Sequence, residues 1–209
     1  RNTPGAALGS TRDKPDQKYC EEIYNVLKKK KINKFYYIGG NDSSDSLRII
    51  SQYSRQKGYN LQCIHVPKTI DNDLVYNDHT PGFGSAAKYV AQLFSGINFD
   101  VKSLPGVYIG VVMGRHAGFL TASSSLLRSK GSDGPHLIFI PEFSFNIKDF
   151  INNINSVFKK YGRCVVAVSE GIKDKNNILY SKKIQSSNEY DDHGLSLIHI
   201  SEPTRQIVI

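Results

Sequence analysis

Residues 67–74 read Pro-Lys-Thr-Ile-Asp-Asn-Asp-Leu, and residues 78–84 read Asp-His-Thr-Pro-Gly-Phe-Gly. The stretch follows an apolar run over residues 61–66 that is typical of a buried strand. The proline before it and the glycine-rich turn after it argue against a regular helix. Open α/β sheets bind ligands at the carboxyl ends of parallel strands, so this stretch is a candidate functional loop.

Two carboxylates, Asp71 and Asp73, stand two residues apart in this loop, beside Lys68 and Thr69. One carboxylate could accept a proton from an attacking hydroxyl while the other orients a metal ion or its water. Lys68 would face an anionic donor. A surface turn is the alternative, because Asp and Asn are common turn residues. The lysine and threonine make the catalytic interpretation at least as good as that alternative.

Short β-rich runs alternate with longer amphipathic runs along the chain. Strands are expected over residues 35–38, 61–66, 107–112, 136–140 and 163–169. Helices are expected over residues 19–30, 44–55, 84–94, 118–130 and 147–161, the second of them capped by Ser43 or Ser44. The alternation predicts βαβ units and a three-layer α/β fold with mostly parallel sheets.

The chain of 209 residues has a net charge of +8, which makes acidic partners plausible. Its length suits one large α/β domain or a domain and a half. The basic residues are spread out except for residues 28–31, which fit the solvated last turn of a helix. No aromatic–basic ladder accompanies them, so phosphorylated small molecules explain the charge at least as well as nucleic acid does, and no nucleic-acid partner is expected.

The three cysteines, Cys20, Cys63 and Cys164, show no C-x-x-C spacing and no pairing with histidine, so no zinc site is predicted. No signal peptide and no apolar run of membrane-spanning length is recognisable. We therefore expect a cytoplasmic protein with no membrane partner. The six histidines have no triad-like context, and none is assigned to catalysis.

A second motif, Gly-Gly-Asn-Asp-Ser over residues 39–43, lies between a predicted strand and a predicted helix. Its glycines let the backbone approach a ligand, and the first turn of the helix offers free N–H groups to phosphate. A βα turn with an Asp or Ser cap is the alternative, and for this motif alone it is the better one.

A third motif, Met113-Gly114-Arg115, follows the strand over residues 107–112 and is expected to open a helix. Arg115 could clamp a transferring phosphoryl group, or it could be an ordinary surface arginine. Residues 82–87 fit a loose G-x-G-x-x-A pattern, but no strand directly precedes them, which argues against a dinucleotide site. The absence of a Gly-Lys dipeptide excludes a P-loop.

Residues 67–84, read with residues 39–43 and Met113-Gly114-Arg115, resemble the phosphofructokinase family, and most closely its pyrophosphate-using branch. The resemblance covers roughly residues 7–175 in unbroken order. It implies a fragment of a two-lobed phosphofructokinase-like fold. It also implies transfer of a phosphoryl group from pyrophosphate to the 1-hydroxyl of fructose 6-phosphate in glycolysis, with Mg²⁺ as cofactor. The full-length chains are then expected to form a homo-oligomer or a hetero-oligomer.

The resemblance also assigns roles to individual residues. Asp71 is the proton acceptor for the sugar hydroxyl, and Asp42 and Lys68 are the other residues assigned to catalysis. The residues expected to bind substrate are Thr69, Ile70, Asp71, Met113, Gly114, Arg115 and Glu170. Those expected to bind the donor are Gly40, Asp42, Lys68 and Arg12, and those expected at the metal are Asn41 and Asp73. Asn41 stands where the family commonly has a metal-binding aspartate, so its amide oxygen or a water would replace a charged ligand.

Two positions determine the expected donor. Asp42 lies where ATP-using members have glycine, and its carboxylate would repel the α-phosphate of a nucleotide. Lys68 lies where ATP-using members usually have glycine, and its ammonium suits a pyrophosphate oxygen. An ATP-dependent 6-phosphofructokinase is the alternative. A non-catalytic lobe that binds sugar phosphate or assembles with another subunit is a second alternative, because the family's first strand and its later arginines and histidine are missing here.

The domain expectation follows the family. Residues 1–82 are expected to form part of a donor-binding lobe and residues 83–190 part of a sugar-phosphate-binding lobe, with the seam in the turn over residues 78–84. Residues 194–209 depart from the family pattern and look like translated adaptor sequence. They are expected to be a non-native tail, with a genuine divergent strand and turn as the alternative.

Overall fold

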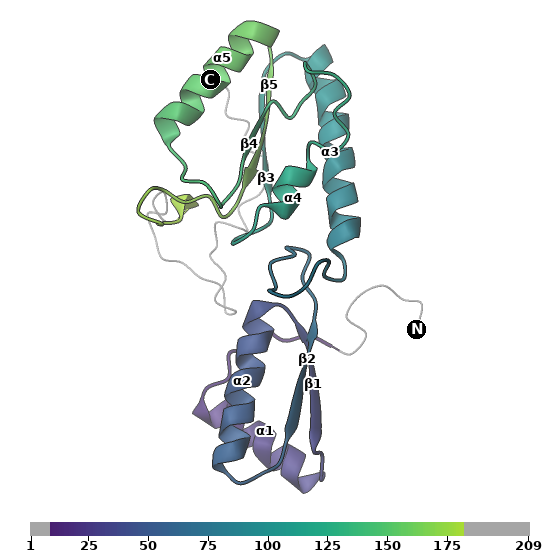
Figure 1. Ribbon diagram of the computed structural model, residues 1–209, viewed down its shortest axis with the longest axis vertical. Helices are drawn as coiled ribbons and strands as arrows, with labels where there is room; N and C mark the ends of the chain where they lie inside the picture. Colours follow the sequence, from purple (N-terminus) through teal and green to yellow (C-terminus); the bar gives the residue numbers. More distant parts are fainter. Residues whose placement is uncertain (1–8, 182–209) are drawn as a thin grey trace. The chain divides into compact units, whose positions relative to one another are not determined.

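The computed structural model describes residues 9–181, and their helices and strands alternate along the chain (Figure 1). The described chain divides into two compact units, one ending at Val66 and one beginning at Pro67. This boundary lies earlier than the seam expected at residue 82, and the assignment of a donor lobe and a sugar-phosphate lobe stays a prediction. The tail expected over residues 194–209 lies outside the described residues.

The first unit pairs two strands beneath two helices. Its elements are α1 (Gln17–Lys29), β1 (Lys34–Gly39), α2 (Asn41–Gln56) and β2 (Gln62–Pro67). The N–H of Gln62 donates to the carbonyl of Asn33 at 2.8 Å, so both strands start at the same end and run parallel. Phe35 and Cys63 pack against the core of the helices, whereas Tyr36 on the opposite face of β1 is exposed. The buried core of this unit contains Cys20, Leu27, Ile50 and Leu61.

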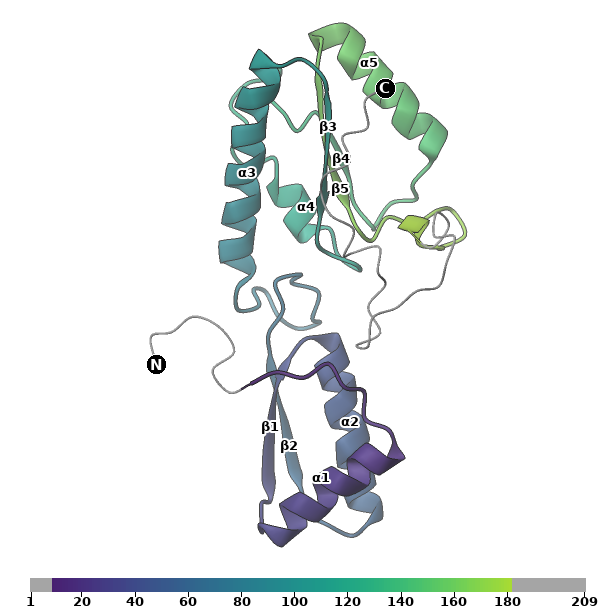
Figure 2. The same cartoon turned by 180° about the vertical axis from the view of Figure 1, so that it is seen from behind.

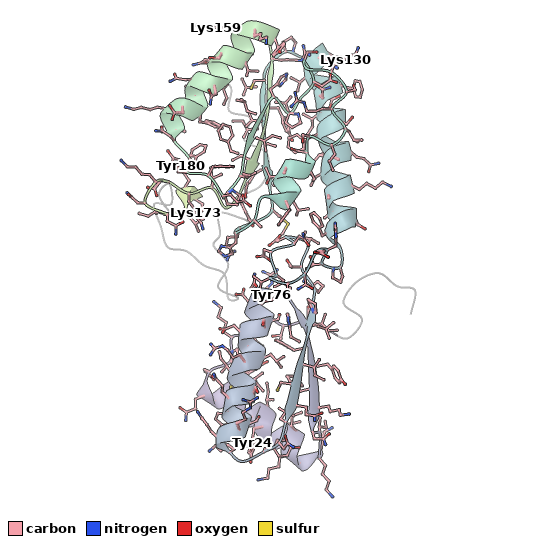
Figure 3. All side chains as sticks on the ribbon, in the orientation of Figure 1. Tyr24, Tyr76, Lys130, Lys159, Lys173 and Tyr180 are labelled. Carbon is pink, nitrogen blue, oxygen red and sulfur yellow. The ribbon has the colours of Figure 1, made fainter. Side chains whose placement is uncertain are left out.

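Aromatic rings extend this core. Tyr24 of α1, which is labelled in Figure 3, meets the rings of Tyr53 and Tyr59 edge-on, at centroid distances of 6.0 and 5.8 Å. Edge-to-face pairs bring the positive ring edge to the negative face and stabilise each pair by about 0.5–1.5 kcal/mol beyond burial. The Tyr59 hydroxyl also donates to the carbonyl of Ile32 at 2.6 Å. These contacts attach α1 to α2 and to the connection before β1.

The expected start of α2 was wrong. The helix begins at Asn41, its N-cap is Gly40, and no side chain caps it, whereas Ser43 or Ser44 was expected to do so. A side chain at Gly39 would collide with the Ser43 hydroxyl, so glycine is required where the chain turns into the helix. Asp42 consequently lies in the first turn, where a carboxylate interacts favourably with the helix dipole.

The second unit is a three-layer sandwich. Its elements are α3 (Phe83–Ser103), β3 (Val107–Val112), α4 (Phe119–Ser123), β4 (Leu137–Phe139), α5 (Ile147–Tyr161) and β5 (Cys164–Ser169). The sheet has the order β3-β5-β4 with parallel pairing, in which Val107 is opposite Cys164 and Leu137 is opposite Val166. Figures 1 and 2 show α3 and α4 on one face and α5 on the other. The predicted α/β fold with parallel sheets is therefore confirmed.

The central strand and α3 supply most of the core of this unit. Every residue of β5 is buried, as expected for a parallel strand with helices on both faces. The core cluster contains Ala87, Val90, Phe94, Ile97, Val101, Val112, Leu120, Val165 and Ala167. On the other face, Phe145 packs edge-on against Tyr180, which is labelled in Figure 3, at a centroid distance of 4.9 Å.

Two helix lengths were wrong. The helix expected over residues 84–94 continues to Ser103, because Ile97 and Val101 extend its buried face. The helix expected over residues 118–130 is only α4, which ends at Ser123. The hydroxyls of Ser123 and Ser124 donate back to carbonyls three residues earlier, and such local bonds compete with continued helix.

Candidate active site

The loop after β2 contains the aspartates that the sequence singled out. Residues 68–82 form turns and bends rather than regular structure, as predicted, and α3 begins at Phe83. The Thr69 hydroxyl accepts a hydrogen bond from the N–H of Asp71 at 3.2 Å. Ile70 packs against the core of the second unit, so its side chain has a clear packing role. Lys68 is exposed at the start of the loop.

Asp71 occupies an acidic and partly buried environment. Burial raises the pKa of its carboxyl, and the nearby carboxylates Asp73 and Glu170 raise it further, while Arg115 and His116 act in the opposite direction. Its Oδ1 is buried and has no hydrogen-bond partner among the residues that the structure describes. An unpaired buried carboxylate oxygen with a raised pKa is suited to accepting a proton from a bound hydroxyl.

A turn at the end of β3 meets the end of β5. The N–H of Gly114 donates to Oε1 of Glu170 at 3.3 Å, and the hydroxyl of Ser169 donates to the carbonyl of Gly114 at 2.6 Å. Gly114 has φ of 127°, which disfavours any other residue. Because β3 and β5 are parallel neighbours, their carboxyl ends bring Gly114 and Glu170 together.

Arg115 is not at a helix N-terminus, and that expectation was wrong. It lies in the loop between β3 and α4, which begins only at Phe119. The loop is held close to β5, since a side chain at Gly171 would collide with the backbone of Arg115. Arg115 and Met113 are both exposed, and Arg115 lies near enough to Asp71 to lower the pKa of that carboxyl.

Three of the donor-site candidates, Arg12, Gly40 and Asp42, belong to the first unit, whereas Lys68 belongs to the second. Gly40, Asn41 and Asp42 form the entry to α2 directly after β1, and Arg12 lies in the exposed segment before α1. The ring of His65 contacts the same turn, with Nε2 at 2.9 Å from the carbonyl oxygen of Gly39. A carbonyl only accepts, so Nε2 carries the hydrogen. The hydrogen bond from His65 thus attaches the turn before Gly40 to β2.

Magnesium would need oxygen ligands, and the loop of the second unit offers them. The charge of Asp73 raises the pKa of Asp71, so the two carboxylates lie close enough to interact. Among the described residues no group of three or more His, Cys, Asp or Glu side chains could enclose a metal ion by itself. Mg²⁺ usually keeps several waters and takes one or two carboxylates plus substrate phosphates, which the loop residues fit.

Sequence reasoning missed four residues around these motifs. They are His65, Asn72, Thr80 and His116. His116 directly follows the third motif, and Asn72 stands between the two aspartates, so their positions in the motifs were the available signal. His65 and Thr80 gave none, because their roles come from contacts with Gly39 and Thr69 across the fold.

The described residues thus define an α/β protein in which each motif follows the carboxyl end of a parallel strand, the edge at which open α/β sheets bind ligands. Within this part of the chain, no helix is long and apolar enough to span a membrane.

Comparison with known proteins agrees with this class. The phosphofructokinase family model matches residues 1–202, and the chain belongs to the phosphofructokinase family. It is 59% identical over 192 residues to a protein of Rhodospirillum rubrum named pyrophosphate–fructose 6-phosphate 1-phosphotransferase. That match covers 92% of this chain and 48% of the relative. A protein of the same name from Xanthomonas campestris is 42% identical over 181 residues, covering 82% of this chain and 43% of the relative.

A solved structure of the same family also matches the chain. The crystal structure of a pyrophosphate-dependent phosphofructokinase from Marinobacter aquaeolei matches with a TM-score of 0.69 and 40% identity. The match covers 83% of this chain and 44% of that one. The chain therefore spans about half the length of the relatives it matches.

Proposed function

We propose that the protein transfers a phosphoryl group from pyrophosphate to the 1-hydroxyl of fructose 6-phosphate, giving fructose 1,6-bisphosphate in glycolysis. The chain described above would contribute the donor turn and part of the sugar-phosphate site. The names of its relatives support the reaction. The observation that carries the proposal is the buried, unpartnered Oδ1 of Asp71 among charged neighbours.

Asp71 acts as the general base. The sugar's O1 attacks the nearer phosphorus of pyrophosphate, the bridging P–O bond breaks, and inorganic phosphate leaves with the electron pair. The proton of the 1-hydroxyl passes to Oδ1 of Asp71. Positioning and charge stabilisation, rather than covalent chemistry by the protein, are the main requirements of phosphoryl transfer. The raised pKa of Asp71 makes it a stronger base once it is ionised.

The remaining residues hold the two substrates. Arg115 supplies positive charge for the transferring phosphoryl group. Glu170 binds a fructose hydroxyl, and its hydrogen bond from Gly114 fixes its orientation. The residues proposed to complete the sugar-phosphate side are Thr69, Ile70, Met113 and Gly114.

Two charges determine the donor. Lys68 attracts the terminal oxygens of pyrophosphate, while Asp42 repels the α-phosphate of a nucleotide. Gly40 and Arg12 complete the donor side, where the positive end of the α2 helix dipole favours anions. An assignment to pyrophosphate thus rests on both attraction of the right donor and repulsion of the wrong one.

Magnesium accompanies the donor in this proposal. Asp73 and the amide oxygen of Asn41, or water molecules that they hold, are the proposed ligands. When bound, Mg²⁺ neutralises charge on the phosphoryl oxygens.

We also infer a cytoplasmic location and an oligomer of full-length chains, either homomeric or heteromeric. The exposed apolar side chains of β3 support an assembly, because Val111 is 71% exposed and Ile109 is 47% exposed on an edge strand. Light scattering of the full-length protein tests the oligomer directly, and a strictly monomeric mass would contradict it.

The test of the reaction is an Asp71→Ser variant of the full-length protein. We expect turnover to fall by about 10²- to 10⁴-fold, which is typical for loss of a general base, while fructose 6-phosphate still binds. Asp78→Ser is the matched control, because Asp78 lies in the same loop with an exposed side chain, and its backbone carbonyl, which accepts from Asn72, is kept in the variant. An equal loss of binding and turnover in Asp71→Ser would assign Asp71 a structural role.

A further inference from the structure

Asn72, between the two aspartates of the loop, has an unusual backbone and a buried side chain. Its φ is 57°, in the left-handed region that asparagine tolerates better than most residues, and only 7% of its surface is exposed. Its Nδ2 donates to the carbonyl of Asp78 at 3.1 Å, and its Oδ1 accepts from the N–H of Thr80 at 2.9 Å. Because a carbonyl only accepts and an N–H only donates, the amide orientation is fixed by its partners.

Thr80 makes a second connection across the same loop. It is 3% exposed, and its hydroxyl donates to the backbone carbonyl of Thr69. The hydroxyl of Thr69 in turn accepts from the N–H of Asp71. The two ends of the loop are therefore joined through Asn72 and Thr80, and Asp71 and Asp73 lie inside this closure.

We propose that Asn72 and Thr80 are positioning residues that set the geometry of Asp71 and Asp73 for phosphoryl transfer. This inference rests on the proposed function of Asp71. Asn72 is bonded covalently to both aspartates, so a change in its backbone angles turns the two carboxylates relative to each other. The hydrogen bonds from its side chain oppose such a change. A misplacement of about 1 Å at a reacting group can cost about 10²-fold in rate.

Paired variants separate positioning from simple stabilisation. Asn72→Gly permits the same φ but removes both side-chain hydrogen bonds. Thr80→Val removes the hydroxyl at nearly constant shape, and Thr80→Ser restores it.

The experiment measures kcat and KM for both substrates, together with the melting temperature, in the full-length protein. We expect kcat to fall by about 10- to 100-fold in Asn72→Gly and Thr80→Val, with KM for pyrophosphate changed by less than about 3-fold. Thr80→Ser should recover most of kcat. A lower melting temperature with unchanged kcat would show a purely structural role and overturn the proposal. Thr80→Val changes the side-chain shape least among the disruptive variants, and a loss of kcat that Thr80→Ser does not share keeps the test decisive if Asn72→Gly fails to fold.

A second readout is independent of turnover. A crystal structure of Asn72→Gly should show the carboxylates of Asp71 and Asp73 displaced relative to their positions in wild type. Unchanged carboxylate positions would contradict positioning. Wild-type protein that transfers no phosphoryl group from pyrophosphate would instead defeat the proposed function, so the two failures are distinguishable.

Discussion

The carboxylate of Glu170 accepts a hydrogen bond from the backbone N–H of Gly114 at 3.3 Å, although 56 residues separate them. This bond joins the residue after β5 to the turn after β3, directly before Arg115. Two segments that the sequence nominated independently are thus connected by the fold, because their strands are parallel neighbours.

Replacing Glu170 tests its proposed contact with the sugar. Glu170→Ala removes the carboxylate proposed to bind a fructose hydroxyl, and loss of a hydrogen bond to a charged group costs about 1.5–3 kcal/mol. We therefore expect KM for fructose 6-phosphate to rise by about 10-fold or more. Glu170→Gln keeps an acceptor oxygen and should lose less. An unchanged KM for fructose 6-phosphate in Glu170→Ala would contradict the proposal that Glu170 binds the sugar.

The same position tests the electrostatics of Asp71. Glu170 is one of the carboxylates that raise the pKa of Asp71, so Glu170→Gln should lower that pKa. Asp71 must be ionised to act as a base, and the acid limb of the kcat profile should then move to lower pH. A limb that moves to higher pH would contradict this assignment.

Asp71 should reduce stability at neutral pH. The pKa of its carboxyl is raised in the folded state, so the folded protein binds the proton more tightly than the unfolded chain does. The free energy of unfolding therefore falls as pH rises from the ordinary aspartate pKa through the raised one. Asp71→Asn should melt higher than wild type at neutral pH, and the difference should vanish below the ordinary aspartate pKa. Calorimetry across pH checks this, and a difference that grows on acidification would contradict it.

Two glycine positions should respond in opposite directions to alanine. In Gly171→Ala the new methyl collides with the backbone of Arg115, and overpacking of this kind costs about 1–3 kcal/mol. Gly96 lies inside α3 with open space beside it, so Gly96→Ala should stabilise by about 0.5–1 kcal/mol. Denaturant unfolding measures both, and equal effects would contradict the packing described at Gly171.

His65 should affect the donor side more than the sugar side. Its Nε2 donates to the carbonyl of Gly39, next to Gly40. His65→Leu removes this donor and should raise KM for pyrophosphate, while KM for fructose 6-phosphate changes less. His65→Gln offers an amide donor and should recover part of the effect. Steady-state kinetics measure KM for both substrates. Equal changes in the two KM values would show that His65 stabilises the fold in general and not the donor side in particular.

Much of the fold could be predicted from local pattern. The ranges expected for β3 and α5, residues 107–112 and 147–161, match the structure. Both have strong periodicity and clear ends, such as the Asn146 cap and the left-handed Gly162 that bound α5. The early end of α4 was not predictable from periodicity, because serine hydroxyls compete for its carbonyls.

The candidate site was predictable only in part. Asp71 and Arg115 could be nominated because each stands in a motif after a strand-like run. The closure of the loop by Asn72 and Thr80 could not be predicted. It depends on the left-handed backbone of Asn72 and on a hydrogen bond between residues eight positions apart. Pairing between Glu170 and Gly114 required the strand order, which no local pattern specifies.

The donor is the central claim, and the ratio of kcat/KM for pyrophosphate to that for ATP tests it most directly. It is to be measured in full-length wild type, Asp42→Gly and Lys68→Gly. We predict that wild type strongly prefers pyrophosphate, that Asp42→Gly shifts the ratio toward ATP, and that Lys68→Gly mainly weakens use of pyrophosphate. A wild type that prefers ATP, or an Asp42→Gly variant with an unmoved ratio, would contradict the account.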